Sequence, residues 1–419
     1  MQGKTKQWSD TAESAILQLP VVHGDHLRIN HNIVKSLDHP GIDQDGTLNG
    51  IAMPFSVSER SSSDISYPTR PLRVLSCDRE MRERSEYASL SVGATLAVGS
   101  GHRLRSEEPD PERTCFERDH DRIIHSAAFR RLAGKTQVFI FPEDHQRTRL
   151  THALEVAQVA VSIAKATRLN VELTEAIALG HDCGHGPGGH ASEQALSIYL
   201  DSGFDHAPWG ADVTLSNLNL CTETLDGIRN HSWSRPMPST PEALVVRWAD
   251  RCAYCAHDLE DAVAAGIVKL DELPDSVSEI LGSTRPRQLN VLIGDIVKCI
   301  RNEGIVGMSP TTARALAELR KFNYERIYMR DESVEQANAV IKILRSLVEF
   351  FIDHPDTLNE VSSKSSHPLI PQASPFVDQK ELVNWAAVAF VAGMTDKFAL
   401  KMASRFLGWN EESFPLGIC

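Results

Sequence analysis

The sequence predicts an all-α protein, and three observations support this. Apolar residues recur at helical spacing along most of the chain beyond Glu107, strand signals are few and short, and no internal repeat of about 20–50 residues is present. Of the 419 residues, 42% are hydrophobic and 24% are charged, which excludes a wholly disordered or collagen-like chain. This length allows one large domain or about two to three smaller ones.

The first 70 residues differ from the rest. They carry clusters of Gly, Pro, Ser and Asp, such as HPGIDQDGTLNG and SERSSSDISYP, with little sustained periodicity. We therefore expect residues 1–70 to form an irregular or loosely ordered extension, with one short helix at Asp10–Leu19. Helical periodicity begins with Phe116–Leu132, which carries an apolar stripe among charged residues. The segment GKTQVFIF (Gly134–Phe141) is rich in β-branched and aromatic residues and is expected to be extended or a loop.

The strongest helical patterns lie in the middle and end of the chain. Thr151–Arg168 and Val171–Asp182 are expected to be helices, the second ending where glycines and a proline cannot continue it. A 24-residue pattern, Glu242–Ala265, is stopped by Gly266. Residues 353–379 are expected to be a polar linker. The remaining helices are expected at Ala191–Leu200, Arg287–Ile305, Thr311–Arg320, Ser333–Ile352 and Asn384–Leu407.

Charge and targeting signals limit the partners. The formal net charge is −13, whereas proteins that coat duplex nucleic acid are usually basic, so an anionic ligand must be held by local cations or by a metal. The sequence has no run of roughly 18 apolar residues and no apolar segment in its first residues, MQGKTKQWSD, so we expect neither a membrane span nor a secretory signal. Eight scattered cysteines favour a reducing, cytoplasmic setting. The one close pair, Cys252 and Cys255, is expected to face the core.

Four residues stand out as candidate metal ligands by type and placement: His152, His181, Asp182 and Asp250. Two imidazoles and two carboxylates suit a borderline divalent ion such as Mn²⁺, Fe²⁺, Co²⁺, Ni²⁺ or Zn²⁺, or a weaker Mg²⁺ site, and leave positions for water or a phosphate oxygen. On spacing alone, each of these histidines is more often a surface residue or one with satisfied hydrogen bonds than a ligand.

The local context strengthens the candidate site. The segment GHDCGHGPGGHAS (Gly180–Ser192) places three histidines, one aspartate, five glycines and a proline in a helix-breaking turn. Glycines let the backbone approach a ligand closely. His190 and Glu193 share a face of the next helix and are suited to orient a water or donate a proton. The alternative is an ordinary helix start, with Glu193 placed favourably in the helix dipole.

The order His152, His181-Asp182, Asp250 resembles the signature of the HD-domain metal-dependent phosphohydrolases. The flanking segments resemble more specifically the deoxyguanosinetriphosphate triphosphohydrolase family, from about Asp78 to the last helix. This resemblance implies an HD-domain helical core with additional C-terminal helices, divided into a catalytic core at 71–285 and a C-terminal region at 286–419 that completes the domain. The matching segments are Arg118–Phe139, Arg147–Ala160, Glu175–Leu196, Leu225–Ser232, Val245–Ala262 and Val391–Leu400.

The resemblance also implies a reaction and roles. In that family a dNTP and water give a deoxynucleoside and inorganic triphosphate. The four candidate ligands match the metal ligands, His190 and Glu193 the catalytic pair, and His185 a further active-site histidine. The substrate-binding matches are Arg149 and Tyr254 near the phosphates, Gln137 near the sugar and Asp258 at the sugar 3′-hydroxyl. An allosteric nucleotide and a homo-oligomer are further expectations from the resemblance, and single-stranded DNA in a groove between subunits is a further candidate partner.

Two points leave the function open at this stage. The family often reads HPPFGH after the HD pair, whereas this chain reads HGPGGH, with Gly186 and Gly188 at the changed positions. Other classes also remain: an HD phosphohydrolase of another nucleotide, or a non-enzymatic HD scaffold that binds nucleotide or single strands. A run of cations before His152 is expected to meet the triphosphate, although Arg130 and Arg131 are equally suited to a solvated helix surface; the run is Arg130, Arg131, Lys135, Arg147 and Arg149.

Overall fold

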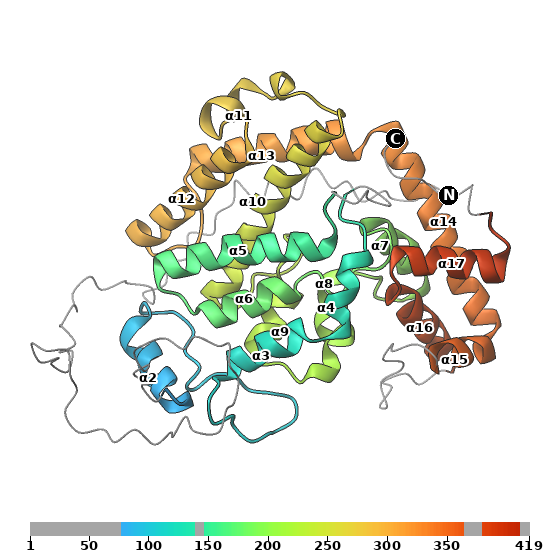
Figure 1. Cartoon of the computed structure of the whole chain (residues 1–419), viewed down its shortest axis with the longest axis horizontal. Coiled ribbons are helices and arrows are strands. Elements are labelled where there is room, and N and C mark those ends of the chain that lie inside the picture. Colours follow the sequence, from blue (N-terminus) through green and yellow to red (C-terminus); the bar gives the residue numbers. More distant parts are fainter. Residues whose placement is uncertain (1–76, 139–145, 364–378, 411–419) are drawn as a thin grey trace, which may run out of the picture. The chain divides into compact units, whose positions relative to one another are not determined.

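The computed structural model describes residues 77–138, 146–363 and 379–410 (Figure 1). Within these ranges the secondary structure is helical, and the extended pairings are two isolated bridges, Arg103 with Cys221 and Thr136 with Thr148. The all-α prediction is confirmed. In the same ranges no helix is long and apolar enough to cross a membrane. The helix expected at Asp10–Leu19 lies outside the described residues.

The first helices are set by side-chain caps. Helix α2 (Arg79–Ser89) begins after Asp78, whose carboxylate accepts from the amide of Met81 at 2.8 Å. Helix α3 (Cys115–Ile124) begins with a capping box formed by Thr114 and Glu117. The single helix expected at Phe116–Leu132 is wrong, because the hydroxyl of Ser126 caps a separate helix, α4 (Ala127–Arg131).

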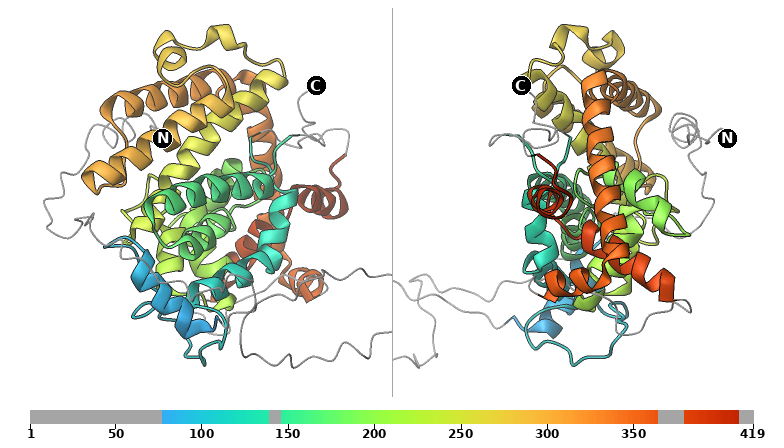
Figure 2. Two further views of the ribbon diagram at one scale, coloured as in Figure 1. Left: turned by 60° about the vertical axis from the view of Figure 1, so that its left-hand side comes forward. Right: turned by 90° about the vertical axis from the view of Figure 1, so that its right-hand side faces the viewer.

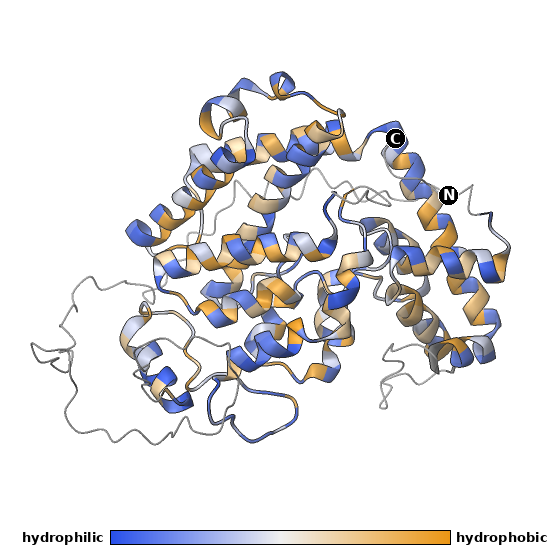
Figure 3. Cartoon of the chain, in the orientation of Figure 1, coloured by the Kyte–Doolittle hydropathy of each residue, from blue (hydrophilic) through white to orange (hydrophobic). Residues whose placement is uncertain are grey.

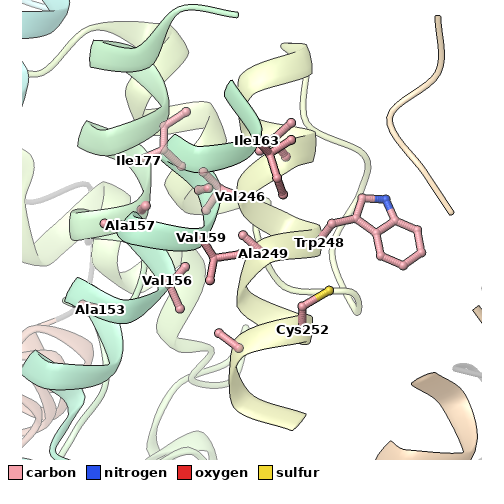
Figure 4. Packing of buried hydrophobic residues seen from close by; sticks show 14 of the residues in the cluster. Ala153, Val156, Ala157, Val159, Ile163, Ile177, Val246, Trp248, Ala249 and Cys252 are labelled. Atoms are coloured by element: carbon pink, nitrogen blue, oxygen red, sulfur yellow. The ribbon is translucent and has the colours of Figure 1, made fainter. Parts of the chain in front are cut away.

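Helices α5 (Arg149–Thr167), α6 (Val171–Gly180) and α10 (Pro241–Ala264) form the centre of the larger hydrophobic core. Figure 4 shows α5 and α10 packed through small and β-branched side chains, among them Ala153, Val156 and Ala249. Small residues let the two helix axes approach closely, so that polar side chains at the ends of α5 and α6 can reach the middle of α10. Cys252 and Cys255 are both buried in α10 as free thiols, so their expected core position is confirmed.

A second hydrophobic cluster joins α7 (His190–Leu196) to the C-terminal helices α14 (Asp331–Asp353), α16 (Gln379–Ala392) and α17 (Asp396–Leu407). Figure 2 shows α14 from two further sides, with α16 and α17 packed along it. The helix that begins with His190 is therefore held by the C-terminal part of the chain.

Two C-terminal predictions need correction. The expected linker 353–379 contains a helix, α15 (Pro355–Ser363), which begins with a proline, a residue suited to the first helical turn. The single stretch expected at Asn384–Leu407 is two helices, because Thr395 caps α17 by accepting from the amide of Phe398 at 3.3 Å. The other strongly periodic segments are helices whose ends lie within a few residues of those expected.

The remaining helices complete the described fold. Figure 3 shows hydrophobic stripes beside hydrophilic ones on most helices, as expected for amphipathic helices packed on a core. Helices α12 (Arg285–Glu303) and α13 (Pro310–Asn323) pack along α10. The remaining elements are α8 (His206–Trp209), α9 (Thr222–Arg229), α11 (Asp275–Ile280), α12 (Arg285–Glu303) and α13 (Pro310–Asn323), the π-helical turns Gly210–Thr214 and Tyr324–Tyr328, and the 3₁₀ turns Leu132–Gly134, Ser197–Tyr199, Ser216–Leu218 and Leu270–Glu272.

Candidate metal centre

The four candidate ligands come from three helices and meet at the core. His152 lies in the first turns of α5, His181 and Asp182 follow the end of α6, and Asp250 lies midway along α10. Nε2 of His152 and Nε2 of His181 lie 3.1 Å and 3.7 Å from Oδ1 of Asp250. Asp182 places Oδ1 3.5 Å from Nε2 of His181 and Oδ2 4.0 Å from Nε2 of His152. The fold thus brings all four together.

The hydrogen bonds of His181 fit a metal ligand. Its Nδ1 lies 2.6 Å from the carbonyl oxygen of Ala178, and since a carbonyl only accepts, Nδ1 carries the hydrogen. In the neutral ring Nε2 then carries a lone pair; this atom is buried and has no hydrogen-bond partner among the described residues. A lone pair aimed at two carboxylates is unfavourable unless a cation lies between them. Both the donor set and this nitrogen fit a divalent ion.

The carboxylates are held in their charged form. Burial would raise the pKa of Asp250, but the hydrogen bond to His152 and the nearby imidazoles lower that pKa to about 2. Burial also opposes ionisation of Asp182, whose pKa is nevertheless well below its ordinary value because Arg149 and two histidines lie beside it. Ionised carboxylates are the form that binds a metal ion.

Arg149, the first residue of α5, lies inside this centre. Its Nη1 donates to Oδ2 of Asp182 at 2.7 Å, and both side chains are buried. Gly189 makes room for the guanidinium, because a Cβ there would lie 2.8 Å from Nη2 of Arg149. Gly184 likewise lets the turn touch α8, since a Cβ would collide with the carbonyl oxygen of His206. Glycine at these two positions is thus a packing requirement of the site.

The turn also carries the expected catalytic group. Nε2 of His185 lies 3.2 Å from Oδ1 of Asp182, and Nδ1 of His190 lies 3.3 Å from Oε2 of Glu193. The other carboxylate oxygen of Glu193 bonds Nδ1 of His206. Burial opposes ionisation of Glu193, but His206 and His190 hold its pKa well below the ordinary value. The His190 side chain is 62% exposed, so this group reaches from the buried centre to the surface.

Two histidines of the centre were not singled out from the sequence. His206 lies in the short helix α8, and His231 follows α9; the ring of His231 lies 4.9 Å from that of His181. No sequence pattern pointed to His206, because it is separated from the glycine-rich turn and surrounded by ordinary residues. His231 falls within the segment Leu225–Ser232, which carried the family resemblance, and this was the signal that could have found it.

The expected substrate residues extend from the centre along α10. Tyr254 and Asp258 follow Asp250 on one face of the helix. Oδ2 of Asp258 accepts from the hydroxyl of Tyr328, a residue the sequence did not indicate, while Oδ1 is buried with no hydrogen-bond partner in the described parts of the chain. Burial raises the pKa of Asp258 to about 7. Gln137 lies in the loop after α4, and its buried Oε1 also lacks a hydrogen-bond partner in the described ranges.

The cationic run does not gather at the centre as expected. Arg147 is used in ion pairs with Glu155, Glu260 and Asp261, Lys135 is buried against backbone carbonyls, and Arg130 is exposed. Arg149 is the member of the run whose described contacts include a candidate ligand. A different cation, Arg251, is buried beside Asp250 in α10 and stacks on Trp233 at 3.7 Å from the ring centroid. Its Nε and Nη1 have no hydrogen-bond partners among the residues that the structure describes.

This fold and site define a metal-dependent phosphohydrolase of the HD class. The HD domain family matches residues 149–255, a range that contains all four candidate ligands. The phosphohydrolase-associated domain family matches residues 306–405. The chain belongs to the deoxyguanosinetriphosphate triphosphohydrolase-like proteins, as its relatives show.

Relatives of that name match most of the chain. One from Caldanaerobacter subterraneus is 41% identical over 329 residues, covering 77% of this chain and 93% of the relative. Another, from Desulfatibacillum aliphaticivorans, is 38% identical over 341 residues, covering 77% of this chain and 95% of the relative. A crystal structure of a hypothetical protein from Aquifex aeolicus covers 69% of this chain and 71% of its own at 20% identity, with a TM-score of 0.35.

Proposed function

We propose that the protein hydrolyses deoxynucleoside triphosphates, dGTP among them, to the deoxynucleoside and inorganic triphosphate. The observation that carries the proposal is the meeting of two imidazoles, two ionised carboxylates and the buried guanidinium of Arg149 in one place. The name shared by the relatives gives the substrate class. In this reaction the bond between the α-phosphorus and the 5′-oxygen breaks, and the oxygen of water joins the phosphorus.

In the proposed mechanism His152, His181, Asp182 and Asp250 hold one divalent ion, with Mn²⁺, Mg²⁺, Fe²⁺, Co²⁺, Ni²⁺ and Zn²⁺ as candidates. Such an ion supplies polarisation of a phosphoryl oxygen and a lower pKa for a water molecule. The backbone carbonyl of Ala178 keeps the ring of His181 in the orientation that presents Nε2. The carboxylates remain charged because of the cationic groups around them.

Arg149 is the proposed phosphate contact. A triphosphate carries several negative charges that must be neutralised where bonds rearrange. The guanidinium is fixed by Asp182, so it needs little reorganisation to meet the substrate. Tyr254 is proposed to lie near the phosphates and to supply a wall against a ribose 2′-hydroxyl. Because Arg251 is buried without a described hydrogen-bond partner, we place it as a further phosphate contact.

His190 and Glu193 are proposed to carry protons during the reaction, with His185 beside them. The departing 5′-oxygen needs a proton, and a histidine near the surface is suited to donate it. Glu193 bonds Nδ1 of His190 and would stabilise the protonated ring. Two turns beyond Asp250 on α10, Asp258 is proposed to bond the sugar 3′-hydroxyl through Oδ1, and Gln137 is proposed to lie near the sugar.

A product assay tests this function. The purified protein is incubated with each of the four dNTPs and with Mn²⁺ or Mg²⁺, and nucleosides and phosphates are separated by ion exchange. We expect deoxyguanosine and triphosphate from dGTP. Release of pyrophosphate or of single phosphate would contradict the proposal and point to another HD phosphohydrolase. No release of any product would point to a scaffold that binds nucleotides without hydrolysing them. Repeating the assay with a second nucleotide or single-stranded DNA tests these as ligands, and gel filtration tests the homo-oligomer.

A further inference from the structure

We infer that Trp233 is a positioning residue for the phosphate chain of the substrate, because its indole ring holds the guanidinium of Arg251 and leaves Nε and Nη1 for a phosphate oxygen. The inference rests on the proposed function, in which Arg251 contacts a phosphate, and it adds a residue that has no part in that function so far. Three observations carry it: the unmet hydrogen bonds of Arg251, its contact with the indole, and the contacts that fix the indole.

Arg251 is a buried cation whose donors are not all used. Its exposed fraction is 4%, and Nε and Nη1 have no hydrogen-bond partner in the ranges that the structure describes. A buried polar group normally has its hydrogen bonds satisfied, because removing it from water without replacing them is costly. One turn earlier on α10, the terminal nitrogens of Arg247 donate to the backbone carbonyl oxygens of Asn230, Trp233, Arg235 and Pro236. Arg251 instead needs an acceptor that a ligand can supply.

The guanidinium of Arg251 lies over the ring of Trp233. Its ζ carbon is 3.7 Å from the ring centroid, within the range of a cation–π contact. Such a contact uses the face of the guanidinium, whereas its N–H bonds lie in the plane and point past the ring. The contact also replaces part of the hydration that the buried cation has lost. Trp233 thus holds the cation in place without using the donors that a phosphate oxygen would need.

Trp233 is itself fixed by α10. Its Nε1 donates to the carbonyl oxygen of Arg247 at 3.1 Å, and its own carbonyl oxygen accepts from Nη2 of Arg247 at 3.2 Å. The ring of Trp248 packs on it edge to face, with centroids 4.7 Å apart. The orientation of the indole is therefore set before any ligand binds. A preorganised cation needs little rearrangement to meet a phosphate, which is the condition for strong electrostatic stabilisation.

The charges around the ring favour an anionic ligand. The ζ carbon of Arg247 lies 5.1 Å from the ring centroid of Trp233, so two guanidinium groups lie near one indole. Burial and the positive charge of Arg251 lower the pKa of Arg247 to about 10. Like charges on neighbouring turns of a helix repel each other, and an anion bound at Arg251 relieves this repulsion. A triphosphate supplies both the negative charge and the oxygen acceptors that Arg251 needs.

Binding of inorganic tripolyphosphate tests the inference without turnover. Isothermal titration calorimetry on the full chain, at a constant excess of Mg²⁺, gives the dissociation constant for wild type and variants. We expect Trp233→Leu to bind about tenfold more weakly, because a buried cation–π contact is lost, and Trp233→Phe, which keeps an aromatic face, to stay within about threefold of wild type. Trp248→Leu loses a neighbouring buried indole, so it should lower Tm while tripolyphosphate affinity stays within about twofold of wild type.

A double variant separates positioning from general destabilisation. If Trp233 acts through Arg251, adding Trp233→Leu to Arg251→Met should not weaken binding further than Arg251→Met alone. Additive losses in the double variant, wild-type affinity in Trp233→Leu, or no binding of tripolyphosphate to the wild type would each overturn the inference. If Trp233→Leu fails to fold, Arg251→Lys still decides. It keeps the charge but loses the planar face, so it should bind at least about fivefold more weakly, and wild-type affinity would again overturn the inference.

The outcome is separate from the proposed function. Weaker tripolyphosphate binding in Trp233→Leu, for a chain that cleaves no dNTP, would remove only the function. Triphosphate release from dNTPs by the wild type, with unchanged tripolyphosphate affinity in Trp233→Leu, would remove only the role of Trp233.

Discussion

Two carboxylates on one face of α10 are given widely different pKa values by their surroundings. Hydrogen bonding to His152 and the neighbouring imidazoles lower the pKa of Asp250 to about 2, whereas burial raises the pKa of Asp258 to about 7, against the lowering effect of its hydrogen bond from Tyr328. Such separation of pKa values divides the roles of acidic groups in an active site. Asp250 is suited to bind a cation, and Asp258 to exchange hydrogen bonds with a neutral group such as a sugar hydroxyl.

The raised pKa of Asp258 gives the unfolding free energy a predictable pH dependence. Its pKa rises on folding from about 3.8 to about 7, so between these pH values the folded chain binds the extra proton. Stability from this group is therefore full below about pH 4 and is lost as pH rises through 7, by on the order of a few kcal/mol. In thermal melts from pH 4.5 to 7.5, Asp258→Asn should gain Tm relative to wild type as pH rises. A constant difference would contradict the shift, and Asp356→Asn, on the exposed start of α15, is the control.

His190 is the residue whose predicted role is easiest to separate from metal binding. It is exposed, and its described hydrogen bond is to Glu193, which is not one of the candidate ligands. His190→Ala should lower the turnover number by about 10²–10⁴-fold, as expected for loss of a general acid, while metal content stays at the wild-type value. Steady-state kinetics and metal analysis on the same preparation check this. A parallel loss of metal would make His190 a ligand, and His125→Ala, at an exposed histidine, should change neither value.

The candidate site could be predicted from the sequence where its residues share one turn or carry the family resemblance, and less well where single residues come from distant elements. His181, Asp182, His185 and His190 share one unusual turn, and the composition of that turn strengthened candidates that spacing alone left open. His206 and Tyr328 reach the centre only through the packing of separate helices, which residue order does not reveal. The prediction that the cations before His152 gather at the site failed for the same reason. Arg147 forms ion pairs with acidic residues of α10, which lie far along the sequence.

At the scale of elements, the junction of α16 and α17 contacts and supports the turn that carries the proposed catalytic residues. The carboxylate of Asp396 accepts from the amides of Thr136 and Gly188, both at 2.9 Å. Nζ of Lys135 donates to the carbonyl oxygens of His185 and Ala392, at 3.1 Å for the latter. The start of α17 thus ties the loop after α4 to the turn that carries His185 and His190.

Removing this brace should impair catalysis without touching a ligand. In Asp396→Ala, two buried amides lose their acceptor, at a cost of about 1–3 kcal/mol each in the free energy of unfolding. We expect a lower Tm and at least a tenfold lower turnover number, with unchanged metal content. Asp396→Asn keeps one carbonyl oxygen as an acceptor, so it should recover part of the lost Tm and part of the lost turnover number. Turnover equal to wild type in Asp396→Ala would show that the turn holds its shape alone.

The helix boundaries were predicted well for long periodic helices and missed where a single side chain ends or starts a helix. The long periodic helices α5, α10 and α14 were predicted within a few residues, because their apolar spacing extends over many turns. The breaks at Ser126 and Thr395 were missed, since a single capping hydroxyl interrupts a pattern that otherwise continues. Both signals are present in the sequence, but hydrophobic periodicity outweighs them unless the cap is considered first.

At the scale of the whole molecule, a chain of net charge −13 is expected to act on a polyanion. The long-range field of an acidic protein slows the approach of a triphosphate, whereas Arg149, as the proposed phosphate contact, would attract it only at close range inside a buried centre. Added salt screens exposed charges more strongly than buried pairs, with a Debye length that falls from about 30 Å at 0.01 M to about 8 Å at 0.15 M. The two contributions to binding therefore respond differently to ionic strength.

This difference predicts the salt dependence of the reaction. We expect kcat/KM for dGTP at saturating Mn²⁺ to stay level or to rise about two- to fivefold as KCl increases from 0.01 to 0.15 M. The reason is that salt screens the long-range repulsion between the acidic protein and the triphosphate more than it screens the short-range attraction by buried Arg149. Initial rates at low dGTP concentration measure it, with sucrose as a control for solvent effects. A steep fall would mean that exposed cations guide the substrate. In that case the buried guanidinium of Arg149 would not be the main electrostatic contact, and surface lysines and arginines would have to be tested in its place.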